Sequence, residues 1–180
     1  LIDANDRTII GDPNPDFTYG FQTRISWRSL SLSASFNGVQ GRDIMNTGIR
    51  YTGTPGIKSN NIVRKAFLGM WTEENHSNLY PSSTYTVENG VVMDRYVEDG
   101  SYLRCSDITL SYTLPKNWMK AIGFKNTMIY ASVKNAFVIT DYSGYDPEVN
   151  SFAFDGLRPG IYMNSYPNPR SFIFGLNVTF

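Results

Sequence analysis

Regular alternation of apolar and polar residues is the feature that most constrains how this 180-residue chain can fold. Every odd position from 17 to 27 except Thr23 is aromatic or aliphatic, and every even one is polar or glycine. The alternation resumes on even positions from Leu30 to Phe36. A period of two residues is typical of β-strands. With Arg28 and Ser29 as the turn, Trp27 faces Leu30 and Phe21 faces Phe36, so apolar residues pair throughout and we predict a hairpin.

Three further segments alternate in the same way, at positions 102–114, 127–139 and 172–180. Each is close to the roughly 9–11 residues that a tilted strand needs to cross a bilayer. Aromatic residues make up 14% of the chain and charged residues only 18%, yet mean hydropathy is −0.29. A membrane β-barrel explains this combination, because one face of each strand meets lipid and the other meets a polar interior.

The lengths of the connections support this interpretation. Short connections, at 28–29 and 115–126, alternate with long ones, at 39–101 and 140–170. Bacterial barrels place short turns in the periplasm and long loops outside the cell. We therefore expect Phe180, Trp27 and Trp118 at the periplasmic rim, where an aromatic girdle lies. A soluble β-sandwich is the structural alternative, although its turns recur at shorter intervals.

Several classes of function are disfavoured by composition. The formal net charge is +0, so the chain lacks the basic surface that nucleic acid requires. A single cysteine and a single histidine exclude an intrachain disulfide and a multi-histidine metal site. His76 lies in a polar segment without converging partners, so we expect no catalytic centre and no enzyme.

Motifs spread along the whole chain resemble the late barrel strands of SusC/RagA-type TonB-dependent transporters. They are Gly11-Asp12-Pro13-Asn14-Pro15-Asp16-Phe17, Val97-Glu98-Asp99-Gly100-Ser101-Tyr102-Leu103-Arg104, Tyr142-Ser143-Gly144-Tyr145-Asp146-Pro147-Glu148 and Gly175-Leu176-Asn177-Val178-Thr179-Phe180. The resemblance implies an all-β fold: residues 1–180 would be about five C-terminal strands of a 22-stranded antiparallel barrel with long extracellular loops. The plug domain, the TonB box and the earlier strands would lie outside this chain.

The resemblance also implies a function and partners. The protein would import glycans, or peptides, across the outer membrane of a Gram-negative cell together with a SusD-like surface lipoprotein. The TonB complex would supply energy through the missing plug. A soluble or surface β-sandwich module for carbohydrate binding or adhesion is the alternative function.

Two loop regions contain candidate contact residues. A helix is predicted over 59–71, capped by Ser59 or Asn60 and ending in Trp71, which we consider for partner binding. The second region follows residue 140 and combines aromatic rings with carboxylates that suit sugars. Its candidates are Tyr142, Tyr145, Asp146 and Glu148. Turn chemistry explains Asp146 equally well, and binding of Ca²⁺ by these carboxylates is a further hypothesis.

The strands carry the remaining candidates. Polar side chains expected to face the barrel lumen are Gln22, Arg24, Asp107 and Lys134. The spacing of Gly175, Val178 and Phe180 matches the C-terminal signal read by the outer-membrane barrel-assembly machinery. Before barrel closure the last strand is an unpaired edge, which can pair with another protein as an added strand.

Overall fold

The computed structural model describes residues 4–54, 61–85, 92–121, 123–148, 150–152 and 154–180. The chain divides into two compact units. The strand unit comprises residues 16–40, 101–141 and 168–180, and the loop unit comprises residues 1–15, 41–100 and 142–167. Each unit is described by itself.

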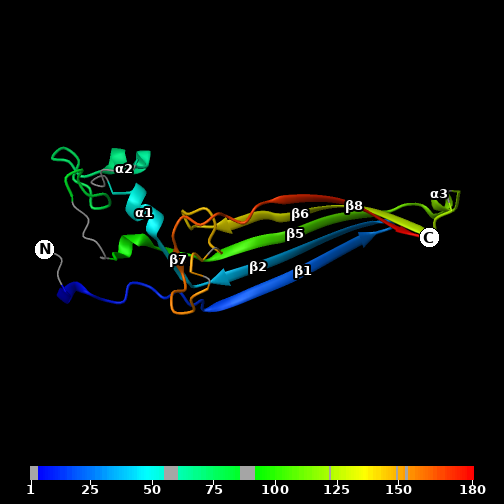
Figure 1. The fold of residues 1–180 in the computed structure, drawn as a ribbon, viewed down its shortest axis with the longest axis horizontal. Helices are drawn as coiled ribbons and strands as arrows, with labels where there is room; N and C mark the ends of the chain where they lie inside the picture. The colour runs from blue at the N-terminus through cyan, green and yellow to red at the C-terminus, as the bar shows by residue number, and fades with distance from the viewer. Residues whose placement is uncertain (1–3, 55–60, 86–91, 122, 149, 153) are drawn as a thin grey trace. The chain divides into compact units, whose positions relative to one another are not determined.

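The strand unit is a five-stranded antiparallel sheet (Figure 1). Its spatial order is β1-β2-β5-β6-β8. The strands are β1 (Phe17–Trp27), β2 (Leu30–Gln40), β5 (Tyr102–Thr113), β6 (Asn126–Thr140) and β8 (Ser171–Thr179). These are the five strands predicted from the alternation, and a short helix, α3 (Lys116–Ala121), connects β5 to β6.

The predicted hairpin register is confirmed. Trp27 pairs with Leu30 and Phe21 pairs with Phe36. The rings of Phe21 and Phe36 stack with centroids 4.5 Å apart. Arg28 begins the two-residue turn with φ 53°, a left-handed conformation that suits tight hairpins. The pairing of apolar with apolar residues therefore set the register, since a shift by one residue would invert both faces.

The sheet has one apolar and one polar face, and its apolar side chains are exposed. Phe174 is 80% exposed and Leu176 is 64% exposed. In a soluble β-sandwich these side chains would be buried against a second sheet, so the sandwich alternative is wrong. An exposed apolar face on strands of this length matches the lipid-facing wall of a barrel.

The short connections lie at one end of the sheet, as Figure 1 shows. The register places Leu30, Tyr112, Ile129 and Leu176 in one row near this end. Phe180 follows directly after β8 and contacts Phe124 edge-to-face at 5.4 Å between ring centroids. The chain thus brings Phe180 and Trp27 to the same end, as the connection lengths predict.

Sequence alternation did not indicate the bulge in β5. The register of β5 shifts around Ser106 against both neighbours. Ser106 is an extra residue relative to β2, whereas Asn135 and Ala136 of β6 lie opposite it. The hydroxyl of Ser106 donates to the carbonyl oxygen of Ser35 at 3.1 Å. An extra residue keeps apolar residues on one face of the strand on both sides of the bulge.

The loop unit contains a second, three-stranded sheet that the sequence did not predict. Its strands are β3 (Asp43–Asn46), β4 (Val97–Asp99) and β7 (Ile161–Tyr162). Central β3 pairs with β4 in antiparallel and with β7 in parallel orientation. Ile44, Tyr142 and Tyr162 form its small core. The two long connections are therefore folded into one structure.

The helices of the loop unit are short. They are α1 (Thr47–Thr52), α2 (Arg64–Gly69) and the 3₁₀ turns η1 (Ala4–Asp6) and η2 (Asp94–Tyr96). The predicted helix over 59–71 is too long. Ser59 and Asn60 lie outside the described residues, and Val63 precedes α2 without a side-chain cap. Helix α2 ends at Gly69, a poor helix former, and Met70 is extended. Among the described residues, no helix is long and apolar enough to span a membrane.

Candidate functional site

A hydrogen-bonded cluster occupies the polar face of the strand unit at the bulge in β5. The carboxylate of Asp107 accepts from Lys134 at 2.8 Å and from the hydroxyl of Ser132, also at 2.8 Å. The hydroxyl of Thr109 donates to its other oxygen at 2.9 Å. Asp107 pairs with Lys134 across β5 and β6. The cluster therefore ties two strands together through charge-assisted hydrogen bonds.

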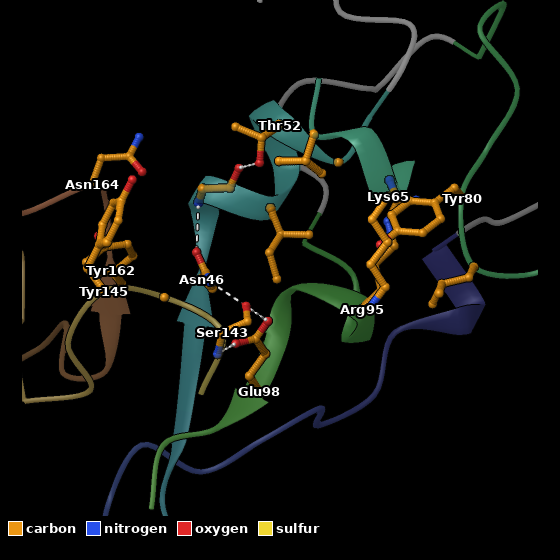
Figure 2. Close-up of a pocket in the computed structure, with 16 residues that line it drawn as sticks. Asn46, Thr52, Lys65, Tyr80, Arg95, Glu98, Ser143, Tyr145, Tyr162 and Asn164 are labelled. Carbon is orange, nitrogen blue, oxygen red and sulfur yellow. Dashed lines mark hydrogen bonds between the residues drawn. The ribbon is translucent and has the colours of Figure 1, made fainter. Parts of the chain in front are cut away.

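The loop unit contains a pocket of about 530 Å³. Figure 2 shows two groups of labelled side chains on opposite sides of the view, with Asn46, Glu98 and Ser143 between them. One group is Lys65, Tyr80 and Arg95, and the other is Tyr145, Tyr162 and Asn164. Both long connections contribute to this lining. The volume is in the usual range for small-molecule sites, about 300–1,000 Å³.

Glu98 and Ser143 join the two connections at this pocket. The backbone N–H of Ser143 donates to one carboxylate oxygen of Glu98 at 2.9 Å, and its hydroxyl donates to the other at 2.6 Å. Asn46 approaches the same hydroxyl at 3.5 Å and caps α1 by accepting from the N–H of Gly48 at 3.1 Å. Both oxygens of Glu98 are thus already engaged within the protein.

Two buried tyrosines belong to the core of the loop unit, and one of them, Tyr162, lines the pocket. Tyr142 and Tyr162 pack edge-to-face with ring centroids 6.0 Å apart. The hydroxyl of Thr47 donates to the carbonyl oxygen of Tyr162 at 2.7 Å, which fixes α1 to β7. Burial raises the pKa of the Tyr142 hydroxyl well above its usual value, and the charge of Glu98 adds to this. Burial likewise raises the pKa of Tyr162. Both rings stay neutral and structural at physiological pH.

The pocket lining includes two cations. The guanidinium of Arg95 donates to the hydroxyl of Tyr96 at 2.8 Å and to that of Thr54 at 3.4 Å. Its Nε is buried and has no hydrogen-bond partner among the described residues. Lys65 projects from α2 and is exposed, with no ion pair to any residue that the structure describes. Neighbouring side chains therefore hold the guanidinium of Arg95, whereas no ion pair within the described residues holds the ammonium of Lys65.

Comparison with known proteins supports a single family. The chain is 33% identical over 183 residues to TonB-dependent receptor P3 of Formosa agariphila, covering 99% of the chain and 18% of that receptor. It is 30% identical over 187 residues to TonB-dependent receptor SusC of Bacteroides thetaiotaomicron, covering 99% of the chain and 16% of SusC. The structure of the RagAB peptide transporter matches the whole chain at 26% identity and a TM-score of 0.86, over 19% of its own chain. No family model matches.

This chain belongs to the SusC/RagA-type TonB-dependent receptors. It spans less than a fifth of the length of these relatives. The predicted family, the partial antiparallel barrel and the outer-membrane location are confirmed by these matches. The relatives are named receptors or transporters rather than enzymes, which confirms that this receptor segment is not an enzyme.

Of the five loop residues predicted from sequence, only Tyr145 lines the pocket of the receptor segment. Tyr142 is buried in the core of the loop unit. Asp146 is also buried, and it accepts from the N–H of Glu148 at 3.0 Å, as expected for turn chemistry. Glu148 is exposed. Trp71 is 41% exposed and stacks on His76, with ring centroids 5.6 Å apart.

Sequence reasoning missed the cations of the pocket. Lys65 and Arg95 are far apart in sequence and neither lies in an alternating segment, so no local pattern connects them. The described residues contain no group of three or more histidine, cysteine, aspartate or glutamate side chains arranged to hold a metal ion. Ca²⁺ binding in a loop stays a prediction from the sequence.

The predicted strand residues are placed as follows. Gln22, Asp107 and Lys134 lie in one row across the polar face, with Ser35 between the first two. Arg24 lies on the same face in the next polar row, opposite Ser33. That this face lines the barrel lumen stays a prediction. Asp107 and Lys134 bind each other, so neither is simply solvated.

The predicted assembly signal spans both faces of β8. Gly175 pairs with Tyr130, and the ring of Tyr130 occupies the space that a side chain on Gly175 would fill. Val178 lies on the face of β8 opposite to Gly175, and Phe180 follows the strand. Recognition of these residues by the assembly machinery stays a prediction, while the packing of Tyr130 gives Gly175 a structural role.

Proposed function

We propose that this receptor segment forms part of the wall and part of the cell-surface loops of a TonB-dependent outer-membrane importer of glycans or peptides. The observation that carries the proposal is the single-layered sheet with an exposed apolar face and a hydrogen-bonded polar face. Such a sheet suits a barrel wall between lipid and a polar interior. The names of its relatives, TonB-dependent receptors and a peptide transporter, support transport rather than adhesion.

The proposed importer has partners outside this chain. Energy would reach it from the TonB complex through a plug domain, and the barrel-assembly machinery would insert it into the membrane. A SusD-like surface lipoprotein would bind at the loops. Exposed apolar side chains around α2 support a protein contact there: Phe67 is 56% exposed and Leu68 is 64% exposed. Trp71 lies just beyond this helix.

Deleting the gene for the full-length receptor tests the proposed function. We expect the deletion strain to lose growth on one or a few members of a panel of glycans and peptides, and to regain it with the intact gene. A second complementing gene would carry a disrupted TonB-binding segment and should fail to restore growth. Unchanged growth on the whole panel, together with unchanged uptake of labelled solutes, would contradict import.

A further inference from the structure

We propose that the pocket of the loop unit binds an acidic oligosaccharide, with the carboxylate of a uronic acid placed between Lys65 and Arg95. The inference rests on the proposed function of import and names the class of solute. The pocket has two cationic side chains in its lining against one carboxylate, that of Glu98. Ser143 already donates to both oxygens of Glu98, so the Glu98 carboxylate serves to join the two connections.

Arg95 is the stronger of the two anchors for an anion. Thr54 and Tyr96 fix its guanidinium, which also lies 4.9 Å from the centre of the Tyr96 ring. Its buried Nε has no partner among the described residues, and leaving a buried donor unpaired is costly. Planar guanidinium groups bind carboxylates through paired hydrogen bonds. A solute carboxylate would accept from the guanidinium N–H groups of Arg95 that border the pocket.

The opposite side of the pocket suits a sugar ring. Tyr145 is 78% exposed although it borders the pocket, so one face of its ring is available for stacking. Asn164 is exposed and adopts φ 54°, which asparagine tolerates better than most residues. Side-chain amides and hydroxyls both donate and accept hydrogen bonds, as sugar hydroxyls do.

A peptide is the less favoured occupant. Extended peptides are often bound by strand addition along an exposed sheet edge. The outer strands of the loop-unit sheet, β4 and β7, are only three and two residues long. They offer too few backbone groups to align a peptide, and the lining consists mainly of side chains from helices and turns.

Calorimetric titration of the purified full-length receptor with trigalacturonic acid tests this inference. We expect measurable binding that weakens as salt concentration rises, with maltotriose, a neutral trisaccharide, binding at least about tenfold more weakly. Lys65→Gln should weaken trigalacturonate binding by roughly tenfold, about the value of one charge-assisted contact. The matched control is Lys116→Gln, which removes a lysine from α3 in the strand unit and should leave binding unchanged.

Three results would overturn the inference: equal binding of maltotriose, tighter binding of a triglutamate peptide, or unchanged affinity in Lys65→Gln. The growth experiment on the deletion strain keeps the two proposals separate. A strain that needs the receptor for a neutral glycan, while trigalacturonate fails to bind, would refute the acidic pocket and leave import intact. A strain that needs it for no solute would refute import itself.

Discussion

At the scale of single residues, Asp107 shows how one carboxylate organises the polar face of the sheet. It accepts from Lys134, Ser132 and Thr109. The side chain of Asp107 is 19% exposed and that of Lys134 is 52% exposed. If the Asp107 carboxylate were removed, water could hydrate the exposed ammonium of Lys134. The hydroxyls of Ser132 and Thr109 are less accessible to water. The cluster stabilises the pairing of β5 with β6 mainly through the hydrogen bonds that Asp107 accepts, and less through the charge attraction between Asp107 and Lys134.

Replacing this carboxylate should destabilise the barrel modestly. We expect Asp107→Ala to lower the free energy of unfolding by about 1–2 kcal/mol, because three donors lose their acceptor. Urea unfolding of the full-length receptor in lipid vesicles would measure the change. Asp16→Ala is the control, since Asp16 is exposed and its side chain has no hydrogen bond among the described residues. Equal effects of the two substitutions would contradict a specific role for the cluster.

The stability of the loop unit should depend on pH through Tyr142. Burial raises the pKa of this hydroxyl above the ordinary value of 10.0. A raised pKa in the folded state means that the neutral form contributes stability below about pH 10 and that this contribution is lost as pH rises further. We expect cleavage within residues 142–167 of the full-length receptor by an alkali-tolerant protease to increase above that pH. In Tyr142→Phe the increase should move to higher pH, and an unchanged midpoint would refute this explanation.

At the scale of elements, the long strands were predictable and the loop elements were not. Strand β1 alternates over its full 11 residues, so its register follows from the need to keep apolar residues on one face. Strand β7 has two residues and pairs in parallel with β3, more than 110 positions earlier. No local pattern encodes such a contact. The pocket escaped sequence analysis for the same reason, because its lining combines residues as far apart in the sequence as Lys65 and Tyr145.

Glycine positions in the strands reveal a further element-scale device. The ring of Tyr130 covers Gly175 on the polar face, and the ring of Tyr19 covers Gly38 on the apolar face. A glycine weakens a strand unless a neighbouring side chain fills the space above it. Each tyrosine therefore packs across the sheet onto the adjacent strand, which adds contact between strands where the glycine contributes none.

A double-mutant cycle would distinguish packing at Gly175 from recognition during assembly. We expect Gly175→Val to displace the ring of Tyr130 and to lower the stability of the folded receptor by about 1 kcal/mol. The effect should shrink in the presence of Tyr130→Ala, because the clash is then absent. Heat-modifiability on electrophoresis gives the folded fraction, with Gly20→Val as a control for substitution in a less crowded position. Full additivity would instead support a role of Gly175 in recognition.

At the scale of the whole molecule, the strands form a wall that only a complete barrel can close. The sheet ends at β1 and β8, each of which pairs with one neighbour within the described chain. Unpaired edges invite association with other strands. Phe180 lies at the end of β8, one of these two edges.

Phe180 provides a test of assembly as distinct from stability. We expect Phe180→Ala in the full-length receptor to reduce the amount of folded barrel in the outer membrane severalfold, because the terminal ring would belong to the predicted assembly signal. Phe124→Ala removes the partner ring that Phe180 contacts. If Phe180 acts only by packing, both substitutions should reduce surface levels to a similar extent, and that result would contradict the assembly signal.

The parallel pairing of β3 with β7 has a consequence for how the surface loops can move. Together with the bonds from Ser143 to Glu98, it joins the connection of residues 41–100 to that of residues 142–167. Neither connection can swing independently without breaking this sheet. Fluorescent probes placed separately on the two connections of the full-length receptor should therefore report displacements with the same timing during the proposed transport. The two connections would therefore move together, although strands β5 and β6 separate them in the sequence.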